Sequence, residues 1–326
     1  MSHETCVLLA IHNGQQFLEK QIQSLLGQTY LEFDLWILND ASSDQSMVLC
    51  RKLLEKFNSK IYFLENSKPS GPTQAFQKLL KAAFESKEPV YKNFFFCDQD
   101  DIWASNKIEL SLEELNKIRG PGLIHSDLSL IGPTDEILAS SLHKKMGLKN
   151  LEGEVFWNSL VAQNVITGCS LAINRDLAEI SLPIPDSALM HDHWLGLVAS
   201  FSGRIAYLPQ SLVFYRQHST NASGGMGERG FFKKLLRHIC FPNLWKKKIQ
   251  GRWKQMQALE IFLKTHPHTE SFTQNQVLKF RKFLELSNLT GIHFLVTGFR
   301  FRIQAQGFIR TMSFYLGSLF WRRKIL

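Results

Sequence analysis

The sequence predicts an α/β fold, in which a mainly parallel sheet is flanked by helices, followed by a basic helical region. Two observations lead to this prediction. Short apolar runs alternate with amphipathic stretches over residues 1–130, whereas cations gather with aromatic residues over 226–326. Alternation of strands and helices is typical of parallel sheets, because each crossover between parallel strands needs a connection about as long as a helix.

The composition is that of a folded protein with a large core. The chain has 326 residues, of which 44% are hydrophobic and 21% charged, which excludes a disordered chain. No apolar run reaches about 18 residues, so we expect no transmembrane helix. The apolar stretch at residues 5–11 is too short for a secretory signal and is predicted to be the first strand. The five cysteines are odd in number and form no Cys-x-x-Cys pair, which favours reduced, buried thiols in a cytoplasmic protein.

The elements of the first half follow from periodicity. Strands are predicted at Cys6–Ile11, Phe33–Leu38, Ile61–Leu64, Asn93–Cys97 and Gly122–His125. Helices are predicted at Gln15–Leu26, Asp44–Phe57, Pro72–Phe84 and Ser105–Ile118, with Asp44 and Ser105 as N-caps and Pro72 in a first turn. In such sheets ligands bind beyond the carboxyl ends of the strands. The polar residues that follow each strand are therefore the candidates for a site.

The second half is less regular. The sequence predicts a helix at Glu154–Leu160, a strand at Val165–Asn174, a helix at Met190–Phe201 and strands at Arg204–Leu208 and Leu212–Arg216. The polar, glycine-rich residues 219–227 are predicted to form a mobile loop and a domain boundary. We therefore divide the chain into residues 1–225 and 226–326.

Acidic residues follow two of the predicted strands. Asp40 follows the second strand, where it can accept a hydrogen bond from a nucleotide or cap the next helix. Asp98, Asp100 and Asp101 follow the buried strand Asn93–Cys97. Three carboxylates crowded at one strand end repel one another, and a divalent Mg²⁺ or Mn²⁺ relieves that repulsion. The alternative is an acidic turn that caps the helix after it.

Two further groups lie at element ends in the second half. Asp192 stands between His191 and His193 at the start of a predicted helix, where it can act as a general base, belong to a metal site or cap the helix. Arg216 and His218 end the last predicted strand, and they can contact phosphate and a metal or serve the structure.

These segments together resemble the family 2 glycosyltransferases of the GT-A fold, especially their rhamnosyltransferase-like branch. The resemblance covers roughly residues 5–225, and its most specific segment is Cys97-Asp98-Gln99-Asp100-Asp101-Ile102-Trp103. The other segments are residues 7–14, 125–128, 167–169, 191–194 and 215–218.

The resemblance implies a role for each matching residue. Ala10, His12, Asn13, Asp40 and Asp98 would bind the nucleotide. Asp100 would be the direct metal ligand, with Asp98 and His218 as further ligands, and Asp192 would deprotonate the acceptor. We also expect contacts to the acceptor or the diphosphate from four residues, Trp103, His191, Trp194 and Arg216.

The implied activity is the inverting, metal-dependent transfer of one sugar, with rhamnose as the first sugar to test. The donor would be a nucleoside-diphosphate sugar and the acceptor a saccharide or a lipid-linked saccharide in bacterial surface polysaccharide synthesis. The Q-x-x-R-W motif of processive synthases is absent, which favours a single transfer. His12 stands where the family usually has Tyr, and Asn39 replaces a common Asp. These departures leave open a non-catalytic nucleotide-sugar-binding protein.

Two other enzyme classes fit less well. A metal-dependent phosphatase of the haloacid-dehalogenase type needs a nucleophilic Asp after its first strand, where this chain has His12 and Asn13. A dehydrogenase needs a Gly-x-Gly-x-x-Gly motif after its first strand, and none is present.

The last third of the chain is strongly basic. Residues 226–326 contain 19 Lys and Arg against 4 Asp and Glu, whereas residues 1–225 contain 19 against 25. The cations alternate with aromatic and aliphatic residues, as at 231–237, 245–248, 299–302 and 314–324, a pattern that favours an anionic membrane surface over nucleic acid. We therefore expect a cytoplasmic protein, peripheral on the inner face of the cell membrane. A solvated basic face and a partner-binding helical bundle are the alternatives.

Overall fold

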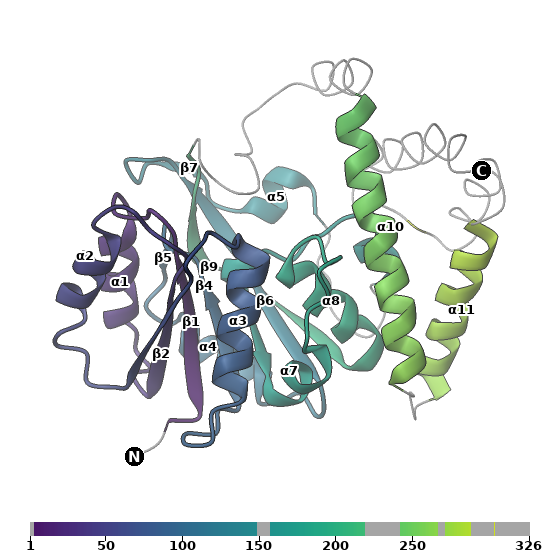
Figure 1. Cartoon of the computed structure of the whole chain (residues 1–326), viewed down its shortest axis with the longest axis horizontal. Coiled ribbons are helices and arrows are strands. Elements are labelled where there is room, and N and C mark those ends of the chain that lie inside the picture. The colour runs from purple at the N-terminus through teal and green to yellow at the C-terminus, as the bar shows by residue number, and fades with distance from the viewer. Residues whose placement is uncertain (1–2, 149–156, 219–241, 267–270, 288–302, 304–326) are drawn as a thin grey trace.

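The computed structural model describes residues 3–148, 157–218, 242–266, 271–287 and 303 (Figure 1). The strands are β1 (Thr5–Ile11), β2 (Phe33–Asn39), β3 (Ile61–Glu65), β4 (Asn93–Cys97), β5 (Ile102–Trp103), β6 (Gly122–Ile131), β7 (Ile137–Ala139), β8 (Leu171–Asn174) and β9 (Arg204–Arg216). Within these described ranges they form one sheet in the order β3-β2-β1-β4-β8-β6-β9-β5, and β7 pairs with β6.

The helices form a layer on each face of the sheet (Figure 1). Helices α3 (Pro72–Phe84), α6 (Trp157–Ala162), α7 (Arg175–Ser181), α8 (His191–Ser202), α10 (Pro242–Thr265) and α11 (Ser271–Ser287) contribute to one core cluster. Helices α1 (Leu18–Leu26), α2 (Ser46–Leu53), α4 (Lys107–Leu115) and α5 (Leu142–Met146) contribute to the other. Alternate residues of the central strand β1 enter the two clusters: Cys6 and Leu8 enter the first, and Val7 and Leu9 the second. This two-sided burial explains why β1 is an unbroken apolar run.

Parallel pairing places the carboxyl ends of three strands at one edge. β1 pairs in parallel with β2, where Ile11 faces Asn39, and with β4, where Leu9 faces Cys97. The residues that follow these strands therefore emerge side by side, although they lie far apart in the sequence. The predicted mainly parallel sheet with helices on its flanks is confirmed.

The other half of the sheet is mixed. β8 is antiparallel to both β4 and β6, and β5 is antiparallel to β9. β9 is one strand over Arg204–Arg216, although two strands were expected, and its register against β6 shifts near Asp127. The strand predicted at Val165–Asn174 begins only at Leu171, because a short 3-10 helix (Gly168–Ser170) precedes it.

Most predicted boundaries agree with the structure to within a few residues. Pro72–Phe84 and Asn93–Cys97 are confirmed at both ends, with Pro72 in the first turn. Ser105 as an N-cap is wrong, because Asn106 holds that position and its side chain makes no capping hydrogen bond. Asp44 precedes the N-cap Gln45, and its carboxylate accepts hydrogen bonds from the Ser46 N–H and hydroxyl. Cys6, Cys50, Cys97 and Cys169 are free and buried, as expected, and Cys240 lies outside the described residues.

Helices α10 and α11 pack against α8, at the end of the molecule opposite α1 and α2 (Figure 1). Their buried residues, among them Met256, Leu259, Phe262, Phe280 and Phe283, belong to the same core cluster as α3 and β4. A continuous core thus crosses residue 225, where the sequence suggested a boundary. The glycine-rich residues 219–227 lie outside the described part of the chain. No helix among the described residues is both long and apolar enough to span a membrane.

The shared core generates the first prediction. Leu259 is fully buried, and Ile261, two residues later on α10, is 63% exposed. We expect Leu259→Ala to lower the free energy of unfolding by about 2–5 kcal/mol, because it removes buried methyl groups and leaves a cavity. Ile261→Ala is the matched control and should cost about 0.5 kcal/mol or less. Denaturant unfolding of the full chain measures both, and equal costs would contradict the packing of α10.

Candidate functional site

The carboxyl edge of the sheet opens into a cavity of about 690 Å³. It is lined by the loops after β1, β2 and β4, by the starts of α3 and α8 and by the end of β9. Nine of the residues predicted from the sequence line this cavity: Ala10, His12, Asn13, Asp40, Asp98, Asp100, His191, Asp192 and His218.

The loop after β1 is tied to both neighbouring loops. The His12 N–H donates to Gln99 Oε1 at 2.8 Å, and Gln99 Nε2 donates back to the His12 carbonyl at 2.9 Å. His12 Nδ1 lies 2.7 Å from the Asp40 carbonyl oxygen. Asn13 adopts a positive φ of 49°, and its side chain accepts a hydrogen bond from the Ser43 N–H. These bonds leave the His12 ring at an exposed position on the wall of the cavity.

Asp40 organises the loop before α3. Its carboxylate accepts hydrogen bonds from the Ser70 and Gly71 N–H groups at 2.9–3.0 Å, from the Ser70 hydroxyl and from Asn66 Nδ2 at 2.6 Å. Burial alone would raise the pKa of Asp40, but these hydrogen bonds outweigh it and hold the pKa below its usual value. Asp40 is therefore an anion, and its hydrogen bonds to Asn66, Ser70 and Gly71 shape the wall of the cavity.

Asp98 and Asp100, which follow β4, line the cavity beside the end of β9. His218 Nε2 lies 2.6 Å from Asp100 Oδ2, so the end of β9 meets the end of β4 there. Burial, together with the neighbouring charges of Asp100 and Asp192, raises the pKa of Asp98 to about 8. This shift shows that negative charge is crowded in a poorly hydrated space, which is the condition that a divalent cation relieves.

Two sets of metal ligands are conceivable. Asp98, Asp101 and Cys169 have ligand atoms within 4.8 Å of one another. Asp101 and Cys169 are fully buried, however, and neither lines the cavity. Asp98, Asp100 and His218 all line it, and their oxygen and imidazole atoms suit Mn²⁺ or Mg²⁺ better than a thiol does. These three residues therefore fit a cation that must also touch a ligand in the cavity.

Asp192 lies at the start of α8 and lines the same cavity as Asp98 and Asp100. Its carboxylate accepts hydrogen bonds from Asn164 Nδ2 at 2.9 Å and from the His193 N–H at 2.6 Å. Burial raises the pKa of Asp192 to about 7, although hydrogen bonds from His193, Asn164 and Gly168 oppose the shift. A carboxylate with a pKa near neutrality is suited to take a proton from a hydroxyl group.

His191 forms an apolar wall beside Asp192. Its ring stacks on Phe96 at 5.4 Å between centroids and lies 4.3 Å from Phe76. Burial lowers the pKa of His191 to about 3, so the ring is neutral. A Cβ atom on Gly168 would lie 2.8 Å from His191 Nε2, so only glycine leaves room for the ring there.

Three predicted contact residues serve the structure outside the cavity. The Arg216 side chain is fully buried, donates to the carbonyls of Asp100 and Gly132, pairs with Asp135 and lies over the Phe17 ring. The Trp103 ring lies 3.9 Å from Lys107 Nζ in the core. Trp194 Nε1 donates to the Ser181 carbonyl. Their burial explains why these three residues do not line the cavity.

Three residues of the site were not singled out from the sequence. Gln99 joins the loops after β1 and β4, Asn164 holds Asp192, and Phe17 lies between His218 and Arg216. Gln99 stands inside the acidic motif and is detectable there, whereas Asn164 and Phe17 carry no local signal because their partners are distant in sequence.

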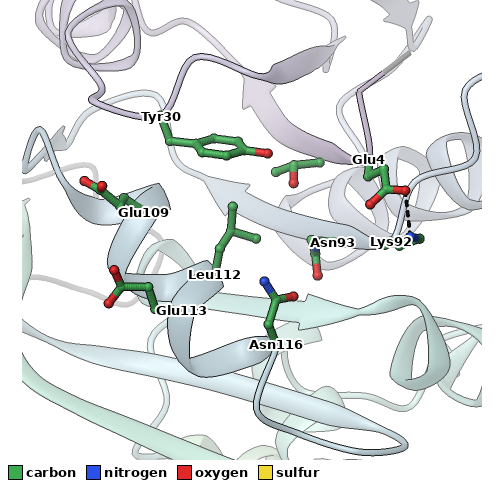
Figure 2. Close-up of a pocket in the computed structure, with 9 residues that line it drawn as sticks. Glu4, Tyr30, Lys92, Asn93, Glu109, Leu112, Glu113 and Asn116 are labelled. Carbon is green, nitrogen blue, oxygen red and sulfur yellow. Dashed lines mark ion pairs between the residues drawn. The ribbon is translucent and has the colours of Figure 1, made fainter. Parts of the chain in front are cut away.

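A second hollow, of about 360 Å³, lies at the amino ends of β1 and β4 (Figure 2). Glu109 and Glu113 of α4 face it, and Glu4 pairs there with Lys92 at 2.6 Å. It is the smaller of the two and lies away from the carboxyl edge where such sheets bind ligands. We therefore take the larger cavity as the functional site.

Comparisons with known proteins show which proteins the chain is similar to. Residues 6–123 match the family model described as glycosyl transferase family 2. The chain is 26% identical over 219 residues to an uncharacterized glycosyltransferase of Nostoc sp., a match that covers 66% of this chain and 65% of that protein. It is 28% identical to a dTDP-rhamnosyl transferase of Shigella flexneri over 32% of this chain and 36% of that protein. The similarity thus spans less than two thirds of either relative.

Two further comparisons concern acceptor and fold. A UDP-Glc:α-D-GlcNAc-diphosphoundecaprenol β-1,3-glucosyltransferase of Escherichia coli is 31% identical over 34% of this chain and 40% of that protein. The structure of a mannosyltransferase from Pyrobaculum calidifontis, in complex with GDP-Man and Mn²⁺, aligns with a TM-score of 0.53 at 14% identity, covering 92% of this chain and 74% of that one. The family match covers β1 to β4 and the acidic motif after β4, where the cavity lies. The chain is therefore similar to the family 2 glycosyltransferases over residues 6–123, and it has the GT-A fold.

Proposed function

We propose that the protein is an inverting, metal-dependent glycosyltransferase that moves one sugar from a nucleoside-diphosphate donor to a saccharide or lipid-linked acceptor. The single observation that carries this proposal is the cavity that gathers Asp98, Asp100, Asp192 and His218 from three distant parts of the chain. Such an acceptor belongs to bacterial surface polysaccharide synthesis, as does the undecaprenol-linked substrate in the name of the E. coli relative.

Different residues of the cavity would hold the nucleotide and the metal. Ala10, His12, Asn13 and Asp40 would hold the nucleotide, and the exposed His12 ring would stack on its base. Asp98, Asp100 and His218 would hold Mn²⁺ or Mg²⁺. A cation there would supply positive charge against the negative charge that builds on the departing diphosphate. Rhamnose is our first choice of sugar, in line with the Shigella relative.

Asp192 is placed to act as the general base. In its ionised form it would take the proton of the acceptor hydroxyl while that oxygen attacks the anomeric carbon from the side opposite the diphosphate, which inverts the configuration. Asn164 and the His193 N–H orient one carboxylate oxygen, and the neutral His191 shields the site from water. A non-catalytic binding protein has no need for a base with a pKa of about 7.

The base assignment gives the second prediction. We expect Asp192→Asn to lower kcat for sugar transfer by about 100-fold or more, because the amide cannot accept the proton. Mn²⁺-dependent nucleotide binding should stay within about two-fold, since Asp192 is not among the proposed nucleotide and metal ligands. Transfer assays and calorimetric titration measure the two effects. A near-normal transfer rate in Asp192→Asn would refute the base.

The crowded carboxylates give the third prediction. Since the pKa of Asp98 is raised from its usual value to about 8 in the folded state, the native protein keeps a proton that the unfolded chain has released. In the absence of metal, stability should therefore fall as pH rises from about 4 to 8. We expect metal-free Asp98→Asn to unfold at least about 2 °C above the wild type at pH 8, with no difference near pH 4.

Added Mn²⁺ should reverse the order of the two unfolding temperatures, so that the wild type unfolds above Asp98→Asn. The ion should raise the unfolding temperature of the wild type at pH 8, and less so at pH 6, because binding must displace the Asp98 proton. Asp98→Asn should respond to Mn²⁺ only weakly. Glu113→Gln, in the second hollow, is the control and should respond as the wild type does. Equal Mn²⁺ stabilisation of Asp98→Asn and the wild type would contradict the metal site.

We also propose that the basic residues after position 225 contact an anionic membrane surface. This proposal gives the fourth prediction. The wild type should float with vesicles that contain phosphatidylglycerol and not with vesicles of phosphatidylcholine alone. Reversal of Arg322, Arg323 and Lys324 to Glu should weaken binding by about 100-fold or more, at about 1 kcal/mol for each cation. The matched control reverses three exposed cations of the first 225 residues, Lys52, Lys144 and Lys145. Equal flotation of the two triple variants would end the proposal.

A further inference from the structure

One buried side chain of α10 reaches the segment that carries Asp192. Gln255 is fully buried. Its Oε1 accepts a hydrogen bond from the Leu189 N–H at 2.7 Å, and its Nε2 lies 3.1 Å from His193 Nδ1. Leu189 and His193 flank Asp192 on its two sides, so one amide group is bonded to the chain before and after the proposed base.

The imidazole of His193 is fixed at both nitrogens. Its Nε2 lies 2.6 Å from the Leu160 carbonyl oxygen, which accepts only from a protonated nitrogen. Nδ1 is then the acceptor for the Gln255 amide. Burial lowers the pKa of His193 to about 4, although the Leu160 carbonyl opposes the shift and the Arg252 charge adds to it. A neutral ring with a single N–H matches this pair of bonds.

The same residue holds the carboxylate. The His193 N–H donates to Asp192 Oδ1 at 2.6 Å, in the first turn of α8. A displacement of His193 would therefore move the donor that orients the base. The close approach of α10 adds to the constraint, because a Cβ atom on Gly251 would lie 2.7 Å from the Leu189 side chain.

We infer that Gln255 is a positioning residue for the transfer reaction, through which α10 sets the orientation of Asp192. The inference rests on the proposed function, in which Asp192 is the base. Gln255 itself does not line the cavity, so it acts only through Leu189 and His193. The helix that follows residue 225 thereby becomes part of the catalytic apparatus.

The test is a double-mutant cycle for kcat in the full chain. Gln255→Leu removes both hydrogen bonds at similar size and should lower kcat by about ten-fold or more, because small misplacements of a base are costly. In the Asp192→Asn background the same change should lower the residual rate by less than about two-fold, because nothing remains to be positioned. The Kd for nucleotide with Mn²⁺ should not change in either background. Gln257→Leu, on the exposed side of α10, is the control and should leave kcat as in the wild type.

Two results would overturn the inference. One is a folded Gln255→Leu protein with kcat within about two-fold of the wild type, and the other is an equal loss in both backgrounds, which marks a general structural role. Failure of the proposed function gives a different result. Asp192→Asn alone would then keep near-normal transfer, whatever the effect of Gln255→Leu.

A second variant keeps the inference testable if Gln255→Leu does not fold. Gln255→Glu keeps the acceptor for the Leu189 N–H but presents a carboxylate to His193 Nδ1. The ring should then take up a second proton near neutral pH, which nuclear magnetic resonance of the labelled imidazole detects, and kcat should fall with the donor Kd unchanged. A His193 ring that stays neutral at pH 7, or an unchanged kcat, would refute the link.

Discussion

The whole arrangement depends on carboxylates held together where little water reaches them. Asp98 and Asp192 line the same cavity, and burial raises the pKa of both. A fold does not gain stability from such a cluster, because each ionised group loses hydration and repels its neighbours. In the proposed reaction, a bound cation and a substrate would compensate for this cost. The same repulsion is the reason to expect a less stable metal-free site.

Buried polar contacts beneath the cavity keep this cluster in place. Arg216 carries a guanidinium group into the core, where it bonds to the Asp100 and Gly132 carbonyls and pairs with Asp135. The Arg216 N–H also donates to Asp101 Oδ1. The end of β9 is thereby joined to the loop after β4, which brings His218 next to Asp100. Arg216 acts as a brace for the proposed metal site.

The proposed base, Asp192, is supported by two helices that belong to one core cluster. α8 presents Asp192 at its first turn, and α10 lies against α8 through Gln255 and a shared apolar core. The basic region that the sequence separates from the catalytic region therefore shares its core. If the residues after 225 also contact a membrane, the same helix pair would connect that contact to the acceptor side of the cavity.

The sequence by itself determined the α/β class, most strand and helix positions and the identities of the acidic residues. Periodicity and strand ends are local signals, so Asp40, Asp98, Asp100, Asp192 and His218 were recognisable without coordinates, and the structure brings them to one cavity. Trp103, Trp194 and Arg216 were equally prominent in the sequence but lie in the interior. Local pattern cannot tell a ligand contact from a brace, because both need a polar or aromatic group beside a strand end.

Only the tertiary structure decided which side chains face the cavity and what holds them there. The antiparallel insertion of β8, the shifted register of β9 and the docking of α10 join residues that are 60 to more than 100 positions apart, such as Gln255 with His193 and His218 with Asp100. Such pairings arise from long-range burial of apolar faces, which fixes the relative positions of whole elements. The sequence identified the candidate site residues, whereas long-range packing set their positions relative to one another.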